Sequence, residues 1–454
     1  MPRPRVLGRL LHGLSEARAG HAQRHRPTGF GFAFADRIDY LDGAHWDGLV
    51  CDATFLLSRD YLRVLEQHGP ANLSVRYAIA FRGTKPVAAI TVQVVEVAGA
   101  RMVKAGAAAG GKAGQRREAE AAGGRVRKVL ANAAQSVGVA AGKRMQLRVF
   151  ACGNLLSWGP HGVALARDED PAGLWPAVAE AIYRIRRADR LAGDADLVMV
   201  KDVPGPLVPG AGALDRFSYR RVETEPDMVL DIAPAWRRFE DYSQSLAAKY
   251  RKTVQQIERD IAAAGLRVER LADLEPHADR LHALYLQVHE RAAIRPVTLS
   301  KTYLPALAAA AGPRLRATAV WRERELVGFV TSLKDGESCI GYHIGFDAAT
   351  NAEAPVYFRL LQATIQDAIE WSCSRLSLGR TALEPKARLG ARPQPLHVWL
   401  RHRSPAINLM LRPLLRAVHH AEAPERNPFK DAPRAGGAPP AAKEQRSPRR
   451  TKEQ

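Results

Sequence analysis

The chain has 454 residues, of which 46% are hydrophobic, and a formal net charge of +20 at pH 7. This length is enough for two or three domains, and the hydrophobic share is typical of a globular protein. Four widely spaced cysteines without metal-ligand spacing argue against a disulfide framework and a zinc site, and no apolar run approaches 18 residues. We therefore expect a cytoplasmic protein, either free or peripheral to the inner face of the membrane.

The positive charge is concentrated in three segments. Residues 1–28 carry +5, residues 101–144 carry +8 and residues 421–454 carry +3, so the rest of the chain is nearly balanced. Such segments could contact tRNA or an anionic membrane surface, and solubilising filler is the alternative interpretation. None of the three interleaves aromatic residues, which would favour stacking on bases.

One order of elements is predicted twice. From Tyr61 the chain reads YLRVLEQHGPANLSVRYAIAFRGTKPVAAITVQVV, and from Tyr303 it reads YLPALAAAAGPRLRATAVWRERELVGFVTSLKDG. Each stretch indicates a helix that begins Tyr-Leu, a Gly-Pro break, and two apolar strands joined by a short charged turn. The offset is too long for a solenoid repeat. We therefore predict two copies of one domain, with a cleft between them in which two substrates could meet.

The first lobe is predicted over 46–222, after a basic N-terminal segment 1–45. An Ala-, Gly-, Lys- and Arg-rich insertion, 101–144, interrupts it, and we interpret this insertion as a lid, a membrane-surface contact or a disordered loop. The expected elements of the lobe are a helix over 58–67, strands over 76–82, 86–97 and 145–154, a helix over 174–191 and a strand over 195–203.

The second lobe is predicted over 223–420, before a disordered basic tail 421–454. It opens with a short strand and one long helix that ends at Gly265, with Leu246, Tyr250 and Val254 at helical spacing. Further elements are strands over 266–271, 315–321, 326–334, 338–345 and 375–379, and helices over 275–292, from Tyr303, and over 355–371. A strand meander followed by a helix and another strand predicts an α+β lobe with a mixed, mostly antiparallel sheet flanked by helices.

Three stretches of the second lobe carry a resemblance to a known family: KYRKTVQQIERDIAAAGL, GFDAATNAEAPVYFRLLQATIQDAIE and LSLGRTALEPKARLGARPQPL. In this order they resemble the tandem GNAT-like acyltransferases of the FemAB and BioF2-like type, over roughly 45–420 and most strongly over 241–400. The resemblance implies an N-acyltransferase without a tightly bound cofactor. The acetyl-CoA loop of simple GNAT folds is not visible at the equivalent TNAEAPVYF, which argues against acetyl-CoA as the donor. The resemblance implies acyl-CoA or another activated acyl donor, such as aminoacyl-tRNA.

Acyl transfer to an amine needs a deprotonated nucleophile and stabilisation of the oxyanion. Lys386 matches a lysine of FemAB relatives, and as a cation it could stabilise the oxyanion or a donor phosphate. Arg380 could bind a carboxylate or phosphate, and Glu384 could accept the proton of the amine; a local ion pair is the alternative for both. His161 marks a contribution from the first lobe.

Five further residues are candidates for the site. Asp347 could act as a base or simply favour a turn. Tyr342 and His343 alternate along a predicted strand, so we expect only one of them to face the cleft, and a buried, hydrogen-bonded His343 is the alternative. Lys249 and Arg251 lie near the start of the long helix, where a phosphate grip competes with a solvated helix face.

The leading hypothesis is an N-acyltransferase that moves an acyl or aminoacyl group to an amine acceptor. The acceptor is a small molecule or an envelope precursor, in cell-envelope or exopolysaccharide metabolism. Two alternatives stay open: a catalytically silent binding protein with a GNAT fold, and a transferase that depends on aminoacyl-tRNA.

Overall fold

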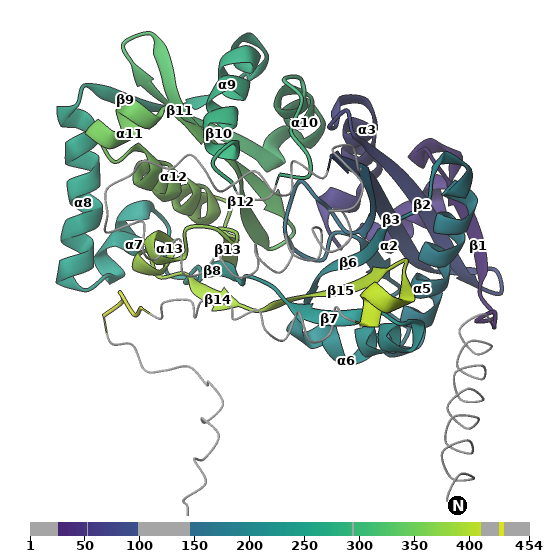
Figure 1. Cartoon of the computed structure of the whole chain (residues 1–454). Helices are drawn as coiled ribbons and strands as arrows, with labels where there is room; N and C mark the ends of the chain where they lie inside the picture. Colours follow the sequence, from purple (N-terminus) through teal and green to yellow (C-terminus); the bar gives the residue numbers. More distant parts are fainter. Residues whose placement is uncertain (1–25, 52, 99–145, 293–294, 410–425, 431–454) are drawn as a thin grey trace, which may run out of the picture.

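The computed structural model describes residues 26–51, 53–98, 146–292, 295–409 and 426–430. Two mixed sheets lie side by side, each flanked by helices, with the second lobe on the left in Figure 1. This arrangement confirms the predicted α+β class. The predicted insertion and most of both basic terminal segments lie outside the described residues.

The first sheet has the order β1-β2-β3-β4-β6-β15-β7, and β5 pairs with β3. Neighbours are antiparallel except for β4 and β6, which are parallel. The sheet includes β1, which lies within the predicted basic N-terminal segment. The strands are β1 (Gly31–Ala35), β2 (Leu73–Arg82), β3 (Lys85–Ala98), β4 (Gln146–Cys152), β5 (Val163–Leu165), β6 (Leu197–Pro204), β7 (Arg220–Glu223) and β15 (Leu396–His402).

The second sheet has the order β14-β8-β13-β12-β11-β10-β9. Its one parallel pair among the described strands is β12 with β13, which corresponds to β4 with β6 in the first sheet. The strands are β8 (Asp227–Asp231), β9 (Leu266–Leu271), β10 (Leu315–Arg322), β11 (Glu325–Asp335), β12 (Ser338–Phe346), β13 (Arg375–Ser377) and β14 (Arg392–Gln394).

The helices cover both sheets, and their ends follow from local sequence. For example, α5 begins after Asp170, whose carboxylate accepts from Ala172 N, and Pro171 occupies the first helical position. The α-helices are α2 (Gly43–Val50), α3 (Arg59–His68), α5 (Pro171–Ala188), α6 (Val208–Ala211), α7 (Phe239–Ser245), α8 (Ala248–Ala263), α9 (Ala278–His289), α10 (Tyr303–Ala311), α11 (Ala348–Glu353), α12 (Val356–Glu370) and α13 (Leu383–Arg388).

The single long helix predicted at the start of the second lobe is wrong, because the chain breaks it into α7 and α8. Leu246 is extended, with ψ 146°, and forms an isolated antiparallel bridge with Phe429. Ala247 N then donates to Pro428 O at 2.8 Å. The tail segment therefore satisfies the backbone groups that a continuous helix would have used.

The predicted duplication is confirmed by the order of the elements. In both lobes a helix (α3 or α10) precedes a hairpin (β2–β3 or β10–β11), and a third antiparallel strand, a helix and a parallel strand follow. Helices α3 and α10 pack against each other. The largest apolar cluster contains buried residues of both lobes, such as Leu62, Tyr77, Leu284 and Phe329. The two copies therefore share one core.

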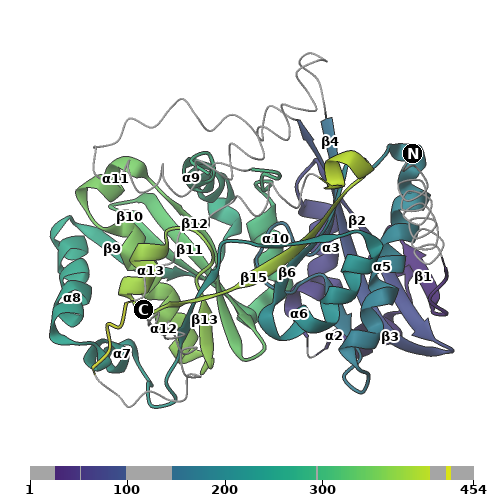
Figure 2. The ribbon, with the colours of Figure 1, turned by 60° about the horizontal axis from the view of Figure 1, so that its bottom comes forward.

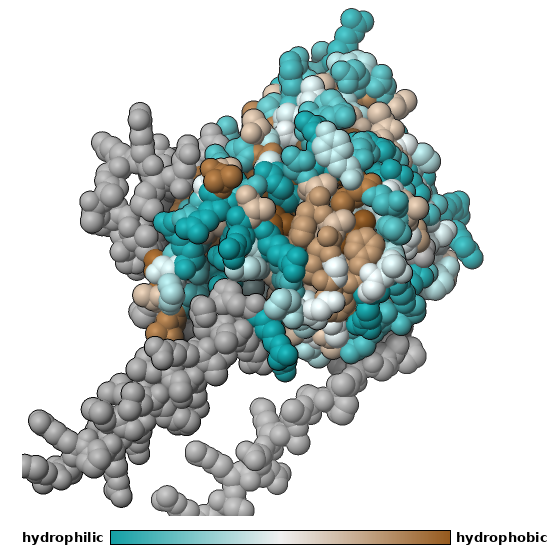
Figure 3. All heavy atoms as spheres, turned by 90° about the vertical axis from the view of Figure 1, so that its right-hand side faces the viewer, coloured by the Kyte–Doolittle hydropathy of each residue, from teal (hydrophilic) through white to brown (hydrophobic). Residues whose placement is uncertain are grey.

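Strand β15 returns from the second lobe to the first sheet. Its residues fall within the predicted second lobe, yet it pairs with β6 on one side and with β7 on the other. Figure 2 shows this strand running between the lobes. The end of the first lobe that faces the viewer in Figure 3 is mostly hydrophilic, with a compact hydrophobic area near its centre.

Candidate active site at the lobe interface

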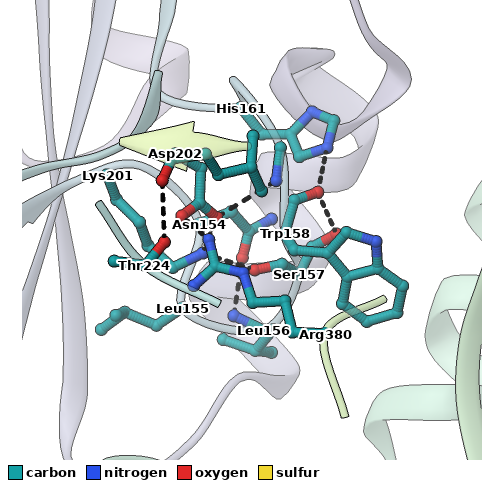
Figure 4. Close-up of polar contacts among 12 residues, drawn as sticks. Asn154, Leu155, Leu156, Ser157, Trp158, His161, Lys201, Asp202, Thr224 and Arg380 are labelled. Carbon is teal, nitrogen blue, oxygen red and sulfur yellow. Dashed lines mark hydrogen bonds and ion pairs between the residues drawn. The ribbon is translucent and has the colours of Figure 1, made fainter. Parts of the chain in front are cut away.

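Polar side chains of both lobes meet where the loop after β4 faces the turn after β13 (Figure 4). Trp158, in the first-lobe loop, donates from Nε1 to Ser377 Oγ at 2.5 Å. Its ring lies over the backbone of Gly379, where a Cβ atom would come within 2.9 Å of the ring. Gly379 also has a φ of +80°, so the turn needs glycine for two reasons. We call this region the interface cluster; it comprises Trp158, Lys201, Asp202, Asp227, Ser377, Gly379, Arg380 and Lys386.

Asp202 is the centre of the cluster. It lies near the end of β6, is 0% exposed and has a φ of +60°, a conformation that non-glycine residues seldom adopt. Its carboxylate accepts from Lys201 Nζ, from Gly159 N at 3.1 Å and from Arg380 Nη2 of the second lobe. One buried carboxylate therefore binds donors from both lobes, and its strained backbone is typical of functional sites.

Lys201 and Arg380 share that single carboxylate. Lys201 Nζ also donates to Ser157 O at 2.7 Å. Burial, and then the positive charge of Arg380, lower the pKa of Lys201 well below the ordinary lysine value. Burial lowers the pKa of Arg380 to about 10, so arginine keeps its proton more readily than lysine does.

Lys386 is a second buried amine, on the second-lobe side of the cluster. It is 3% exposed, and its Nζ donates to Gly379 O at 3.1 Å. Burial lowers its pKa to about 8, against the opposing charges of Asp227 and Glu225. Asp227 accepts from Ser377 Oγ at 2.6 Å and from Gly379 N at 2.9 Å. Lys386 thus changes charge near neutral pH, as a residue in acyl transfer can use.

A third contact between the lobes lies beside this cluster. Asp335, at the end of β11, accepts from Thr54 Oγ1 at 2.7 Å and from Phe55 N at 2.6 Å. Thr54 Oγ1 lies 3.0 Å from His161 Nδ1. His161, the first-lobe candidate, is therefore part of the interface, where burial lowers its pKa.

Tyr342 belongs to a buried chain of hydroxyl groups that crosses the interface. Its OH lies 2.7 Å from Tyr303 OH, which lies 3.2 Å from Tyr61 OH. Asn154 Nδ2 donates to Tyr61 OH at 2.7 Å. Burial raises the pKa of each of the three phenols, so they remain neutral hydrogen-bonding groups.

The predicted alternation of Tyr342 and His343 along the strand is broken, because both side chains lie on the side of Tyr303. Both rings contact the ring or hydroxyl of Tyr303. The register between β11 and β12 changes between the pairs Val330↔Ile344 and Ser332↔Gly341, so Thr331 opposes two residues instead of one. Such a bulge cancels the alternation of side chains along a strand.

His343 is a neutral histidine in this structure. Its Nε2 is buried without a hydrogen-bond partner in the described part of the chain, and the ring packs edge-on against Tyr285. Burial lowers the pKa of His343 to about 3, with a further contribution from His289.

Asp347 lies at the end of β12 and caps a helix. Its carboxylate accepts from Thr350 N at 2.8 Å and from Thr350 Oγ1 at 2.9 Å, which makes it the N-cap of α11. These hydrogen bonds lower its pKa. Its side chain is thus engaged in local structure, apart from the interface cluster.

Glu384, Lys249 and Arg251 lie in a different region, around α8 and α13. Glu384 accepts from Arg388 Nε at 2.9 Å and from Arg426 Nη2 at 2.7 Å, and these pairs lower its pKa. Lys249, in the first turn of α8, lines a cavity of about 480 Å³ together with both arginines. Arg251 follows on α8 but does not line this cavity.

The interface cluster also contains residues that sequence reasoning missed, namely Trp158, Lys201, Asp202 and Asp227. A signal was present for two of them. In the stretch LVMVKDV, a Lys-Asp pair stands inside an otherwise apolar strand. A buried strand carries charges at a cost, so such a pair indicates partners elsewhere in the fold.

The N-terminus of α12 is partly occupied by the protein itself. Tyr357 N donates to Asn351 Oδ1 at 2.8 Å, so one of the amides that a donor phosphate could use is already bonded.

Among the described residues, no group of His, Cys, Asp or Glu could hold a metal ion. The described helices include none that is long and apolar enough to cross a membrane.

Comparisons with known proteins agree with this architecture. Residues 248–387 match the family described as acetyltransferase (GNAT) domain. No curated protein matches the chain. Solved structures with a similar fold include FemX (TM-score 0.49, 9% identity, 82% of this chain and 98% of that one). Another is a tandem GNAT protein from the clavulanic acid biosynthesis pathway, with a TM-score of 0.45 and 11% identity over 83% of this chain and 99% of that one. A third is L-PGS from Bacillus licheniformis, with a TM-score of 0.41 and 11% identity over 78% of this chain and 95% of that one. The second lobe therefore contains an acetyltransferase (GNAT) domain over residues 248–387, and the first lobe repeats its order of elements.

Proposed function

We propose that the protein is an N-acyltransferase whose donor and amine acceptor meet at the interface cluster. One observation carries this proposal most directly. The turn that follows β13 of the GNAT domain brings Arg380 against Asp202 and its partner Lys201 in the first lobe, and Lys386 donates to Gly379 O of the same turn. Both lobes thus contribute charged, largely buried groups to one place, as expected for a reaction between two substrates.

In the proposed reaction the amine nitrogen attacks the acyl carbon, the oxyanion forms and collapses, and the leaving group departs as the amine loses a proton. Lys386 in its ammonium form stabilises the oxyanion, and its only acceptor among the described residues, Gly379 O, leaves two of its hydrogens available. Arg380 fixes the position of the turn through Asp202.

A second candidate donor is aminoacyl-tRNA, and a cavity on the first lobe favours it. This cavity, about 830 Å³ in volume, lies between α5 and the end of β15. Among the described residues that line it, Glu180 is the one acidic residue, and that carboxylate already binds Thr28 and Arg184. An arginine-rich surface of this kind suits phosphate groups. The six arginines of its lining are Arg26, Arg184, Arg187, Arg220, Arg401 and Arg403.

The test is an acyl-transfer assay with acyl-CoAs and aminoacyl-tRNAs on one side and a panel of amines on the other. Lys386→Met should lower kcat about 100-fold or more, the loss typical of removing one oxyanion donor. Lys252→Met is the matched control, because Lys252 is an exposed lysine of α8. Full activity of Lys386→Met, with a folded protein, would exclude the proposed role.

Salt dependence separates the two donors. If the donor is aminoacyl-tRNA, its affinity should fall steeply as salt rises, because phosphate contacts release counterions. An Arg187→Ala, Arg220→Ala double variant should then bind tRNA more weakly and with a shallower salt slope. If the native protein and the double variant transfer an acyl group from acyl-CoA with the same kinetics, aminoacyl-tRNA is excluded as the donor.

A further inference from the structure

A smaller cavity, about 330 Å³ in volume, lies in the first lobe beside the interface cluster. We call it the β6 cavity, because it lies at the end of β6, between β5 and the start of α5. Its wall is mostly apolar and includes Val163, Leu165, Trp175 and Val203, with Arg167 and Glu169 also in its lining. Glu169 already pairs with Arg82 at 2.6 Å and with Lys85 at 3.2 Å.

Lys201 connects this cavity to the interface cluster. It lines the β6 cavity, its side chain is 13% exposed, and its Nζ donates to Ser157 O and to Asp202 Oδ2. A lysine ammonium carries three hydrogens. In the described part of the chain, Nζ has no third acceptor. A ligand in the cavity could supply one.

The charges around Lys201 indicate that this ligand is an anion. Lys201 and Arg380 share one carboxylate, Asp202, which also binds a backbone amide, so the group carries one positive charge in excess when lysine is protonated. His161, which neighbours Lys201, adds no negative charge, and the carboxylate beyond it, Asp335, is bonded to Thr54 Oγ1 and Phe55 N. The Cys152 thiol in the cavity wall is neutral because burial raises its pKa to about 12. An unpaired buried charge is costly, and an anion removes the cost.

We propose that the β6 cavity binds a short aliphatic carboxylate, whose oxygen accepts from Lys201 Nζ and whose chain lies against the apolar wall. An alcohol or a thioester of the same length could fill the cavity but would not neutralise the excess charge, and an amine would add to it. The ligand is either a free acid or the acid end of a larger substrate. Lys201 also belongs to the interface cluster, so this site adjoins the place proposed for the reaction, but binding to the cavity can be measured without turnover.

The experiment is isothermal titration of the full chain with hexanoate, hexanol, hexylamine and hexanoyl-CoA at pH 8. Hexanoate should bind saturably, at least about tenfold more tightly than hexanol, since a hydrogen bond to a charged group contributes about 1.5–3 kcal/mol. Tighter binding of hexanoyl-CoA than of both hexanoate and CoA alone would show that the cavity prefers a neutral thioester, and would overturn the proposal.

Lys201→Met should weaken hexanoate binding about 10- to 100-fold, whereas Lys252→Met should leave the affinity for hexanoate unchanged. Hexanol binding to Lys201→Met shows whether the cavity has stayed intact in the variant. Equal affinity for hexanoate and hexanol in the native chain would overturn the proposal, as would the absence of saturable hexanoate binding. These outcomes need no variant, so they hold even if Lys201→Met fails to fold.

Discussion

The hydroxyl of Tyr61 lies 3.2 Å from the hydroxyl of Tyr303, and each tyrosine lies in the first turn of the corresponding helix of its lobe. The duplicated element therefore contacts its own copy through the same residue. Both side chains are 0% exposed. The contact belongs to a chain of hydrogen bonds that also includes Asn154 and Tyr342.

Tyr303→Phe should destabilise the protein by about 1–3 kcal/mol, because it leaves the buried hydroxyls of Tyr61 and Tyr342 each short of a partner. Chemical denaturation measures this loss. A double-mutant cycle with Tyr61→Phe should show a coupling energy, since the two residues share one hydrogen bond. Tyr40→Phe is the control, because Tyr40 is 74% exposed. If Tyr303→Phe destabilises the protein as little as Tyr40→Phe does, the result contradicts the buried network.

Asp202→Asn should destabilise the fold more than Arg380→Met does. The first change leaves two cations without their carboxylate, at an expected cost of about 3–5 kcal/mol, whereas the second leaves the Lys201–Asp202 pair in place. Equilibrium unfolding of both variants gives the order. Asp47→Asn removes a carboxylate from a more exposed arginine pair and should cost about 1 kcal/mol or less. The reverse order for Asp202 and Arg380 would be inconsistent with a shared carboxylate.

The stability of the protein should depend on pH through Lys386. The pKa of Lys386 is about 8 in the folded chain, whereas the ordinary lysine value of 10.5 applies to the unfolded chain. Between these two pH values the unfolded chain therefore holds a proton that the folded chain has released. The free energy of unfolding should therefore rise with pH over this window, relative to Lys386→Met. Denaturation at a series of pH values tests the sign. If Lys386 acts as an ammonium group, activity should fall above about pH 8.

His343 should act at the other end of the pH scale. Its pKa is about 3 in the folded chain and 6.5 ordinarily, so the stability that the neutral ring contributes is present above 6.5 and is lost as the pH falls toward 3. Relative to His343→Phe, the native chain should thus lose stability over that interval. A constant difference between the two proteins from pH 7 to pH 4 would show that the ring titrates normally.

Gly379→Ala should disturb the interface more than an otherwise similar glycine substitution. Both Gly379 and Gly336 have positive φ, +80° and +59°, but a Cβ at Gly336 meets nothing within 4 Å, whereas at Gly379 it meets the Trp158 ring at 2.9 Å. Gly336→Ala should therefore cost about 1 kcal/mol for the backbone alone. The excess cost at Gly379, measured by thermal or chemical unfolding, should shrink when Trp158→Ala is added.

Sequence periodicity was sufficient to predict the longer strands and helices, such as β3 and α12, because these elements repeat their pattern over enough residues. It failed where distant residues decide local structure. The break between α7 and α8 depends on Phe429, which lies more than 160 residues away in the chain. The bulge opposite Thr331 depends on the pairing of two strands, so alternation along one strand could not predict that Tyr342 and His343 share a side.

The candidate site was predictable only on its second-lobe side. Lys386 and Arg380 were found because the motif around them resembles a known family. Their partner Asp202 lies in a strand whose first-lobe context gave no comparable motif, and the ion pair joins residues 178 positions apart. Glu384 and Arg380 stand close in sequence, yet the structure directs them to different neighbours.

The path of β15 imposes an order on biosynthesis. Strands β6 and β7 have no direct pairing and are joined through β15, whose residues are synthesised after the whole GNAT domain. A nascent chain that has released only its first half therefore holds a sheet with a gap beside β6, and exposed edges of this kind favour pairing with other chains. The first lobe can complete its sheet only after the second has left the ribosome, so truncation before Leu396 damages the lobe that was made first.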